Sequence, residues 1–197
     1  MRILSLALAL LPIAGLAEIR EWRIDTSHSA AHFSVRHMMV SNVRGQLGNI
    51  TGTVKYDPAD PVTAVVNARI EASTIDTRQA KRDAHLRNPD FLDVEKFPAI
   101  TFQSKRVEAV QPGSLKIIGD LTIRDVTREV TLLVDGPSAP LAAGRGGMRS
   151  GATATTTISR KNFGITWNRA METGGAVVGD EVKITVDIEF VEDKPTS

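Results

Sequence analysis

The chain has 197 residues, of which 24 are lysine or arginine and 23 are aspartate or glutamate, and it contains no cysteine. This composition is typical of one ordinary globular domain. A formal net charge of +1 with interspersed signs gives neither a basic stripe for nucleic acid nor a polybasic anchor for an anionic membrane. Without cysteine there is no disulfide, thiolate nucleophile or cysteine-based metal site, so a metal would need histidines and carboxylates.

The first 17 residues have the pattern of a secretory signal. Arg2 supplies the positive charge, an apolar run follows, and small residues surround a cleavage point after Ala17. The apolar run is shorter than the roughly 20 residues that a membrane-spanning helix needs. We therefore expect a signal peptide over 1–17, one exported domain over 18–197, and no stable membrane insertion.

Alternation of apolar and polar residues dominates the rest of the chain and predicts β-strands. It is cleanest near the end, where Val182, Ile184, Val186, Ile188 and Phe190 alternate with polar residues. The predicted rows, in chain order, are 32–36, 64–71, 100–103, 115–123, 130–134, 152–158 and 182–190. We expect about eight strands in all.

Two stretches depart from the strand pattern. The window from Thr77 to Arg87 is rich in Arg, Lys, Gln and Ala and is followed by Asn88-Pro89, which predicts a short helix that ends there. The stretch 136–151 carries five glycines and two prolines, which predicts a long surface loop. The other connections are short, so neighbouring strands should be antiparallel.

About eight strands with one apolar face must close on themselves or stack, because an open sheet would expose its inner face and edges. The choice is therefore between a barrel and a sandwich. The inward rows are mainly Val, Ile, Ala and Leu, and aromatic residues make up 5% of the chain, so few rings are available to fill a barrel. We predict an all-β fold, an antiparallel eight-stranded barrel with one short helical insert, and favour a ligand cavity over a filled core.

Short motifs along the chain occur in the order and spacing of a known family. The first are Trp22-Arg23-Ile24-Asp25, His28-Ser29, Phe33-x-Val35-x-His37-Met38 and Val40-Ser41-x-Val43-x-Gly45. The next are Asp83-x-His85-Leu86, Asp90-Phe91-Leu92-Asp93, Phe97-Pro98-x-Ile100-x-Phe102 and Gly119-x-Leu121-Thr122-Ile123. The last are Ile158-x-Arg160, Phe163-Gly164-Ile165-x-Trp167 and Gly179-Asp180-Glu181-Val182, followed by Glu189. Over this span the chain resembles the YceI-like, polyisoprenoid-binding proteins.

The resemblance implies a lipocalin-like barrel with an elongated apolar pocket, found in the periplasm. It implies that the protein carries a long isoprenoid-type lipid, needs no cofactor and catalyses no reaction. A respiratory quinone or a fatty-acid derivative would suit the same pocket, and an enzyme acting on such a lipid is a further alternative. Leu47 stands where a Phe is commoner in the family, so the identity of the ligand stays open. We expect no nucleic-acid partner, and a homodimer is left open.

Candidate ligand contacts follow from strand parity, from aromatic residues near the helical window and from the resemblance. His37 shares parity with Phe33 and Val35 and could meet a ligand head group, although a structural histidine is the favoured interpretation. Phe91, Phe97 and Phe102 could line one end of a pocket, with core packing as the alternative. The expected ligand-binding residues are Phe33, Val35, His37, Phe91, Phe97, Phe102, Ile123, Trp167 and Ile184.

Other constellations favour structural explanations, so we expect no metal site and no catalytic residues. On one strand His28 and His32 would lie roughly 13 Å apart, too far to share an ion. No Gly-x-Ser-x-Gly motif occurs, and adjacent residues such as His28 and Ser29 point to opposite sides of a strand.

The charged residues around the helical window have their own alternatives. The carboxylates Asp83, Asp90 and Asp93 are interpreted as capping groups rather than as an acid/base set. The basic residues of the window could bind an anionic head group, but a solvated helix face is favoured. They are Arg78, Lys81, Arg82 and Arg87.

Overall fold

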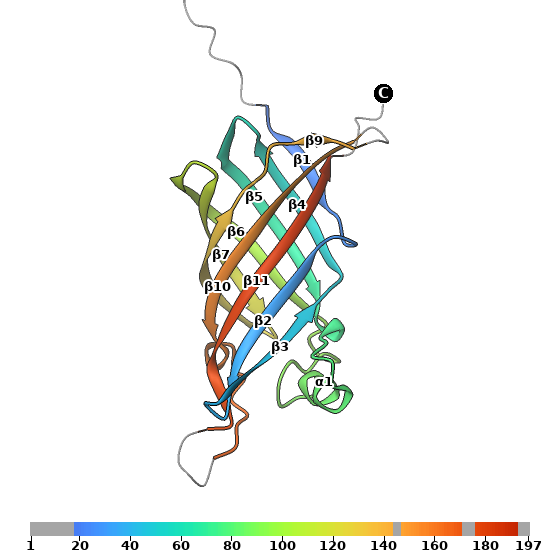
Figure 1. Ribbon diagram of the computed structural model, residues 1–197, viewed down its shortest axis with the longest axis vertical. Helices are drawn as coiled ribbons and strands as arrows, with labels where there is room; N and C mark the ends of the chain where they lie inside the picture. The colour runs from blue at the N-terminus through green and yellow to red at the C-terminus, as the bar shows by residue number, and fades with distance from the viewer. Residues whose placement is uncertain (1–17, 144–146, 171–175, 193–197) are drawn as a thin grey trace, which may run out of the picture.

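The computed structural model describes residues 18–143, 147–170 and 176–192, whose strands form one antiparallel sheet closed into a barrel (Figure 1). The strands of its first half are β1 (Arg20–Ile24), β2 (Ala30–His37), β3 (Ser41–Leu47), β4 (Ile50–Asp57) and β5 (Asp60–Glu71). The helical insert follows with η1 (Ala72–Thr74) and α1 (Ala80–Arg87). The second half contains β6 (Ala99–Gln111), β7 (Ser114–Ile123), β8 (Val126–Asp135), β9 (Leu141–Ala142), β10 (Met148–Ser159), η2 (Arg160–Phe163) and β11 (Val178–Glu192).

Eight strand positions surround the barrel, although the sheet has 11 labelled strands. β1 and β2 both pair with β11 and form two halves of one position. β3 and β4 pair with β2 and β1 and form the next position, interrupted at Gly48 and Asn49. The two-residue β9 pairs with the start of β10 and adds no position to the ring. The predicted antiparallel eight-stranded barrel is confirmed.

The ring closes where β10 meets β8 and β11. β10 pairs with β11 over its whole length, but with β8 at three positions, from Thr153↔Asp135 to Thr155↔Leu133. Beyond these pairs η2 packs against β8, and Arg128 Nε donates a hydrogen bond to the carbonyl of Asn162 at 3.1 Å. The 3-10 turn therefore takes the place of ladder hydrogen bonds where the two strands separate.

The helical prediction is confirmed and the loop prediction is wrong in part. α1 lies within the predicted window, with Gln79 as its N-cap residue. The predicted loop 136–151 contains β9 and the first residues of β10, and residues 144–146 lie outside the described part. Pairing of Met148 with Glu192 of β11 overrides the local preference of a glycine-rich sequence for irregular structure.

Three aromatic side chains close one end of the barrel. Trp22 and Tyr56 are 0% and 1% exposed and stack with their ring centroids 5.7 Å apart. Phe190 packs edge-on against Trp22 with its centroid 5.6 Å away. This is the upper end in Figure 1, and α1 lies at the opposite, lower end.

The predicted signal peptide, 1–17, lies outside the described residues. Over the part of the chain that the structure describes, no helix combines the length and the apolar character needed to cross a membrane.

Candidate functional site

An apolar cavity of about 310 Å³ occupies the barrel. It extends from Tyr56 and Phe190 at the upper end to Leu86 and Ile165 at the lower end. Inward-facing side chains near mid-height, such as Val66, are only half-buried although they point away from the outer surface. Their remaining exposed area faces the hollow, so the interior of the barrel is not filled by side chains.

The alternation of side chains along each strand determines which residues line the cavity. On β11, Val182, Ile184, Val186 and Ile188 all line the cavity, as the alternation predicts for Ile184 and Ile188. Ile184 lies opposite Phe33 of β2 in the register, so two predicted contacts are neighbours on one wall.

Two phenylalanine rings of the wall lie against glycines on adjacent strands. A Cβ atom added at Gly45 would lie 2.5 Å from the ring of Phe33, and one at Gly119 would lie 2.6 Å from the ring of Phe102. Glycine at both positions lets the rings lie close to the strand backbone. The two rings therefore thicken the wall without crossing the hollow.

Six of the nine predicted contacts line the cavity and three do not. The lining residues are Phe33, Val35, Phe91, Phe102, Ile123 and Ile184. His37 does not line the cavity, although its register partner Val178 does, and Phe97 lies under the cations Lys96 and Arg124, at 5.0 and 5.5 Å from its ring centroid. Trp167 packs behind Phe91, with centroids 5.1 Å apart, and against His85 at 4.9 Å. The structure thus places six of the nine residues on the cavity wall and three outside it, and binding stays a prediction for all nine.

Several lining residues were missed from the sequence. Leu86 and Leu92 from the helical insert line the lower part of the cavity, as do Arg160 and Ile165 after β10. The parity of β10 could have found Arg160, because Ala154 and Ile158 of the same row also line the cavity. Leu47, the family departure, lines the cavity and is 8% exposed, so a smaller side chain there leaves more room inside.

Arg160 is a charged group on the cavity wall, and its side chain is 5% exposed. Its Nε donates to the carbonyl of Gly179 at 2.9 Å, and its Nη1 to those of Ile165 and Trp167 at 2.9 and 2.8 Å. Its Nη2 donates to the carbonyl of Val178 and to Asp180, at 3.4 and 3.3 Å. Burial lowers the pKa of the guanidinium below its usual range.

All five N–H donors of this guanidinium are therefore used within the protein. Arg160 ties η2, the segment after it and the start of β11 together at the lower end. It offers no free donor to a ligand, so the cavity can hold a molecule mainly through apolar contacts.

The helical insert lies at the lower end (Figure 1), and polar contacts within it hold α1 in place. Thr77 donates to Asp83 Oδ1 through its backbone N–H at 2.8 Å and through its hydroxyl at 2.5 Å. Burial acts to raise the pKa of Asp83, but the hydrogen bonds from Thr77 and from the backbone of Gln79 outweigh it and lower the pKa. Arg87 donates to the carbonyls of Ser73 and Ile75 at 2.7 Å. These contacts fix α1 to the segment that links it to β5.

The other two carboxylates of this region are paired. Asp90 contacts His85 at 2.8 Å, and Asp93 lies 3.9 Å from Arg124. Among these residues the capping role belongs to Gln79, whose side chain accepts from the N–H of Arg82, and not to an aspartate. None of the three acids lines the cavity.

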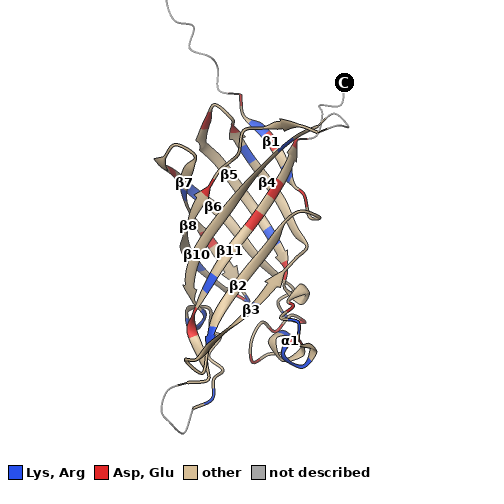
Figure 2. Cartoon of the chain, viewed as in Figure 1, with Lys and Arg blue, Asp and Glu red and all other residues tan. Residues whose placement is uncertain are grey.

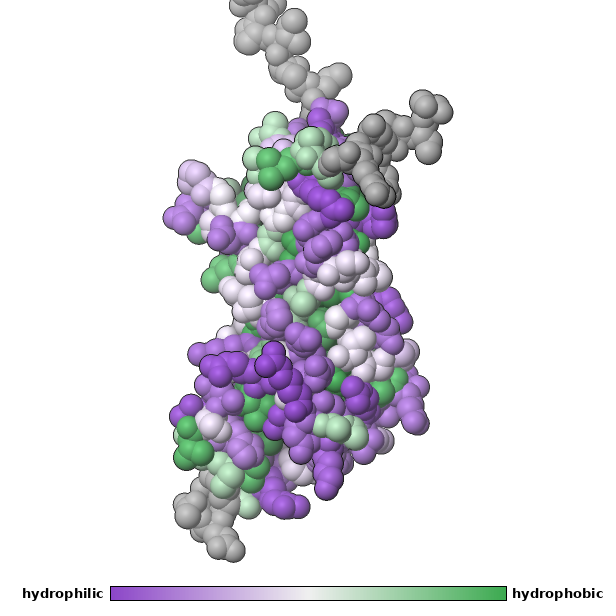
Figure 3. Space-filling model, turned by 45° about the vertical axis from the view of Figure 1, so that its right-hand side comes forward, coloured by the Kyte–Doolittle hydropathy of each residue, from purple (hydrophilic) through white to green (hydrophobic). Residues whose placement is uncertain are grey.

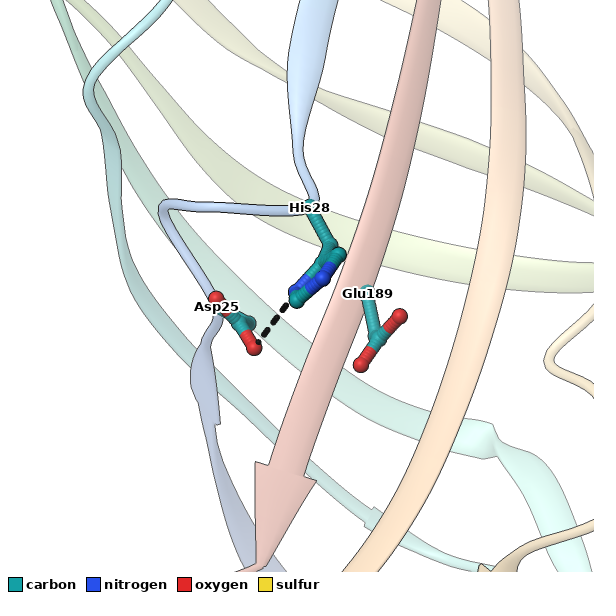
Figure 4. A group of neighbouring side chains, drawn as sticks. All are labelled: Asp25, His28 and Glu189. Carbon is teal, nitrogen blue, oxygen red and sulfur yellow. Dashed lines mark hydrogen bonds and ion pairs between the residues drawn. The ribbon is translucent and has the colours of Figure 1, made fainter.

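A polar cluster lies on the outer wall, where the turn after β1 passes β11. Asp25, His28 and Glu189 bring potential ligand atoms within 4.8 Å of one another (Figure 4). Arg149 Nη1 contacts Asp25 at 2.8 Å and also pairs with Glu189. One guanidinium thus lies between the two carboxylates and offsets part of their negative charge, and we interpret the group as an ion-pair cluster that joins β1, β10 and β11.

This cluster predicts an acid-sensitive contribution to stability. Hydrogen bonds from Arg149 and then His28 hold the pKa of Asp25 well below its usual range. Because the folded state binds the proton more weakly, the ionised group stabilises the fold above about pH 4, and this stabilisation is lost as the pH falls further. Asp25→Asn should therefore lower the melting temperature at neutral pH, and its difference from wild type should shrink in acid.

The measurement is thermal unfolding of both proteins across the acid range. Asp60→Asn serves as the control. It changes an exposed carboxylate at the start of β5, and its melting temperature should stay close to that of wild type. A difference between Asp25→Asn and wild type that is the same in acid and at neutral pH would contradict this assignment.

Comparisons with known proteins agree with this architecture. The UPF0312 protein SA2479 of Staphylococcus aureus (strain N315) is 37% identical over 166 residues, which cover 84% of this chain and 94% of that protein. The crystal structure of Burkholderia cenocepacia BcnA superposes with a TM-score of 0.71 at 20% identity, covering 84% of this chain and 98% of BcnA. A polyisoprenoid binding domain from Saccharophagus degradans superposes with a TM-score of 0.63 at 10% identity, covering 89% and 100% of the two chains.

The two structural comparisons show that the fold is shared. Family membership is shown by the sequence identity to the staphylococcal protein and by a family model. The model of the YceI-like domain matches residues 22–190, which include all of the closed barrel except the first two residues of β1 and the last two of β11. This chain belongs to the YceI-like family.

Proposed function

We propose that the protein is a periplasmic carrier that holds the hydrocarbon tail of an isoprenoid-type lipid in its barrel and leaves it chemically unchanged. The apolar cavity of about 310 Å³ carries this proposal. The likeness to a polyisoprenoid binding domain supports the choice of cargo, and the signal-like sequence before Glu18 supports export.

Burial of hydrocarbon supplies the binding energy. Each methylene group removed from water contributes about 0.8 kcal/mol before the cost of association. A cavity of about 310 Å³ is at the small end of the range for ligand pockets, so it encloses part of a long tail. We expect an extended tail segment inside and the rest of the lipid at the lower end, because the aromatic cluster of Trp22, Tyr56 and Phe190 closes the upper end.

The state of Arg160 narrows the class of cargo. Its donors are all used, and a carboxylate or phosphate drawn into the cavity would lose its hydration without a hydrogen-bonding partner there. The enclosed part of the ligand is therefore uncharged. A respiratory quinone is the second candidate ligand, because its neutral head group also needs no charged partner in the cavity.

Mass spectrometry of the native cargo tests the proposal. Protein purified from the periplasmic fraction of its native host should begin at Glu18 and should release an isoprenoid lipid or a quinone into organic solvent. Delipidated protein should take up such lipids again and gain thermal stability by mass action. Native protein without extractable lipid, together with delipidated protein that gains no stability from any tail, would overturn it.

A further inference from the structure

The hairpin between β2 and β3 ends in three exposed apolar side chains. Met38, Met39 and Val40 are 46%, 64% and 78% exposed. They lie at the lower end of the barrel, and Figure 3 shows hydrophobic surface near that end among hydrophilic side chains. We call these three residues the hairpin tip.

The backbone of the hairpin tip is unfavourable for the residues that occupy it. Met38 and Met39 have φ angles of 48° and 59°, and Val40 N–H donates to the carbonyl of His37 at 3.1 Å. Two successive left-handed residues characterise a type I′ turn, which strongly favours Asn-Gly. A left-handed conformation costs a residue with a side chain about 1–2 kcal/mol. Local stability thus argues against methionine at both positions, and a strained site of this kind points to a role outside folding.

Basic residues without carboxylate partners flank the hairpin tip. The segment 26–56 contains no aspartate or glutamate. Arg36 Nη2 donates to the carbonyl of Met39 at 2.8 Å, which places this guanidinium at the tip. Neither Arg36 nor Arg44 forms an ion pair with a carboxylate of the described chain. Together they give the tip a positive rim.

The two ends of the barrel differ in whether their basic side chains form ion pairs. Arg78 and Lys81 beside and within α1 are exposed at the same end and also have no carboxylate partner among the described residues (Figure 2). Basic residues toward the upper end are paired. They include Arg20 with Glu18, Lys55 with Glu21, and Lys116 with Glu108, at 3.0, 3.0 and 3.1 Å. Several cations without a carboxylate partner among the described residues therefore lie at the lower end, where the unpaired carboxylates Glu95 and Glu181 also lie.

The hairpin tip lies beyond the end of β2, a strand that contributes to the wall of the cavity. Val35 lines the cavity, and Met38 follows it by three residues, which is about 10 Å along a strand. The aromatic cluster is buried at the upper end, whereas Leu86 and Leu92 of the helical insert line the cavity at the lower end. The apolar tip, the free cations and the cavity thus share one end of the molecule.

We propose that the hairpin tip enters the outer layer of an anionic phospholipid bilayer, while the cations of the lower end contact lipid head groups. Apolar side chains gain by leaving water, and each nearby basic residue adds about 1 kcal/mol of attraction to an anionic surface. Three apolar side chains and a few cations give a reversible surface contact and not a stable insertion. The contact would place the cavity next to the membrane from which its lipid is taken or to which it is delivered. This role in lipid transfer rests on the proposed carrier function, whereas the membrane contact itself does not depend on it.

Flotation with lipid vesicles tests this contact. The purified protein is mixed with vesicles of phosphatidylcholine alone or of phosphatidylcholine and phosphatidylglycerol in equal parts. Wild type should float with the anionic vesicles, and salt should weaken its binding. Replacing the strained pair by Met38→Asn with Met39→Gly should lower vesicle binding more than about tenfold. The same double change should raise the melting temperature, because Asn-Gly suits the turn.

Two further variants complete the design. Arg44→Gln should lower binding to anionic vesicles about fivefold. Val110→Asp removes an exposed apolar side chain, 59% exposed, near the upper end and should leave binding unchanged. Failure of wild type to bind anionic vesicles, or equal loss in Val110→Asp and in the tip variant, would overturn the proposal, and so would tip variants that bind like wild type. Tail uptake from detergent, measured on the same proteins, reports separately on the carrier function.

Discussion

Replacing Arg160 by leucine is expected to destabilise the protein by about 3–5 kcal/mol, the range found when one partner of a buried ionic network is removed. The change would remove the side-chain donor from three backbone carbonyls at the lower end of the barrel, those of Ile165, Trp167 and Gly179. The carbonyl of Val178 would keep the hydrogen bond from Asn168 Nδ2 at 2.7 Å. At this chain length about 2–4 °C of melting temperature is lost per kcal/mol. Thermal and urea unfolding of delipidated protein are the measurements, because bound lipid would mask the loss.

Lys161 provides a matched control for this prediction. It also pairs with Asp180, at 2.8 Å, but its side chain is 52% exposed. An exposed ion pair contributes at most about 1 kcal/mol, so Lys161→Ala should remain close to wild type. Similar losses in Arg160→Leu and Lys161→Ala would mean that the pair with Asp180, and not the set of buried carbonyl contacts, carries the effect.

Replacing Ile184 by tryptophan is expected to abolish tail uptake while leaving the lipid-free fold close to wild-type stability. Ile184 lines the cavity opposite Phe33 and is half-buried, so a larger ring can enter the hollow instead of a packed core. Overpacking a filled core typically costs about 1–3 kcal/mol, and a hollow one avoids that cost. Lipid uptake by delipidated protein and its melting temperature without lipid are measured together.

The adjacent residue supplies the control for this substitution. Lys183 points outward on the same strand, so Lys183→Trp adds the same ring to the outer surface and should leave tail uptake unchanged. Strong destabilisation of lipid-free Ile184→Trp with normal lipid uptake would show that the inner face of β11 belongs to a packed core and not to the binding site.

The strands, their inner faces and the helical insert could be predicted from the sequence, because they depend on local patterns. The period of two in 182–190 assigns Ile184 and Ile188 to the inner face wherever the strand lies in the sheet. The helical window before Asn88-Pro89 likewise reflects residues close in sequence. The expectation of about eight strands came from counting the alternating stretches, and the expectation that the sheet closes or stacks came from the need to bury its apolar face.

The position of each residue along the barrel axis could not be predicted from the sequence, because it depends on the register between strands that are distant in the chain. His37 has the parity of Phe33 and Val35, yet it pairs with Val178 beyond a register shift in β11 that lies between Val178 and Val182. Such a shift changes both the height and the direction of the side chains that follow it. Parity alone therefore did not predict that His37 would lie outside the lining of the cavity.

What the sequence determined by itself is the fold class, the family and the apolar face of each strand, since each is encoded in short-range pattern or in motifs. Tertiary structure alone decided that Arg160 would be saturated by backbone carbonyls, since Gly179 and Val178 reach it from another strand. It also decided the charge of the lower end. Arg44 and Lys81 are far apart in a nearly neutral sequence, and only the closure of the barrel and the docking of α1 bring their cations to the same end.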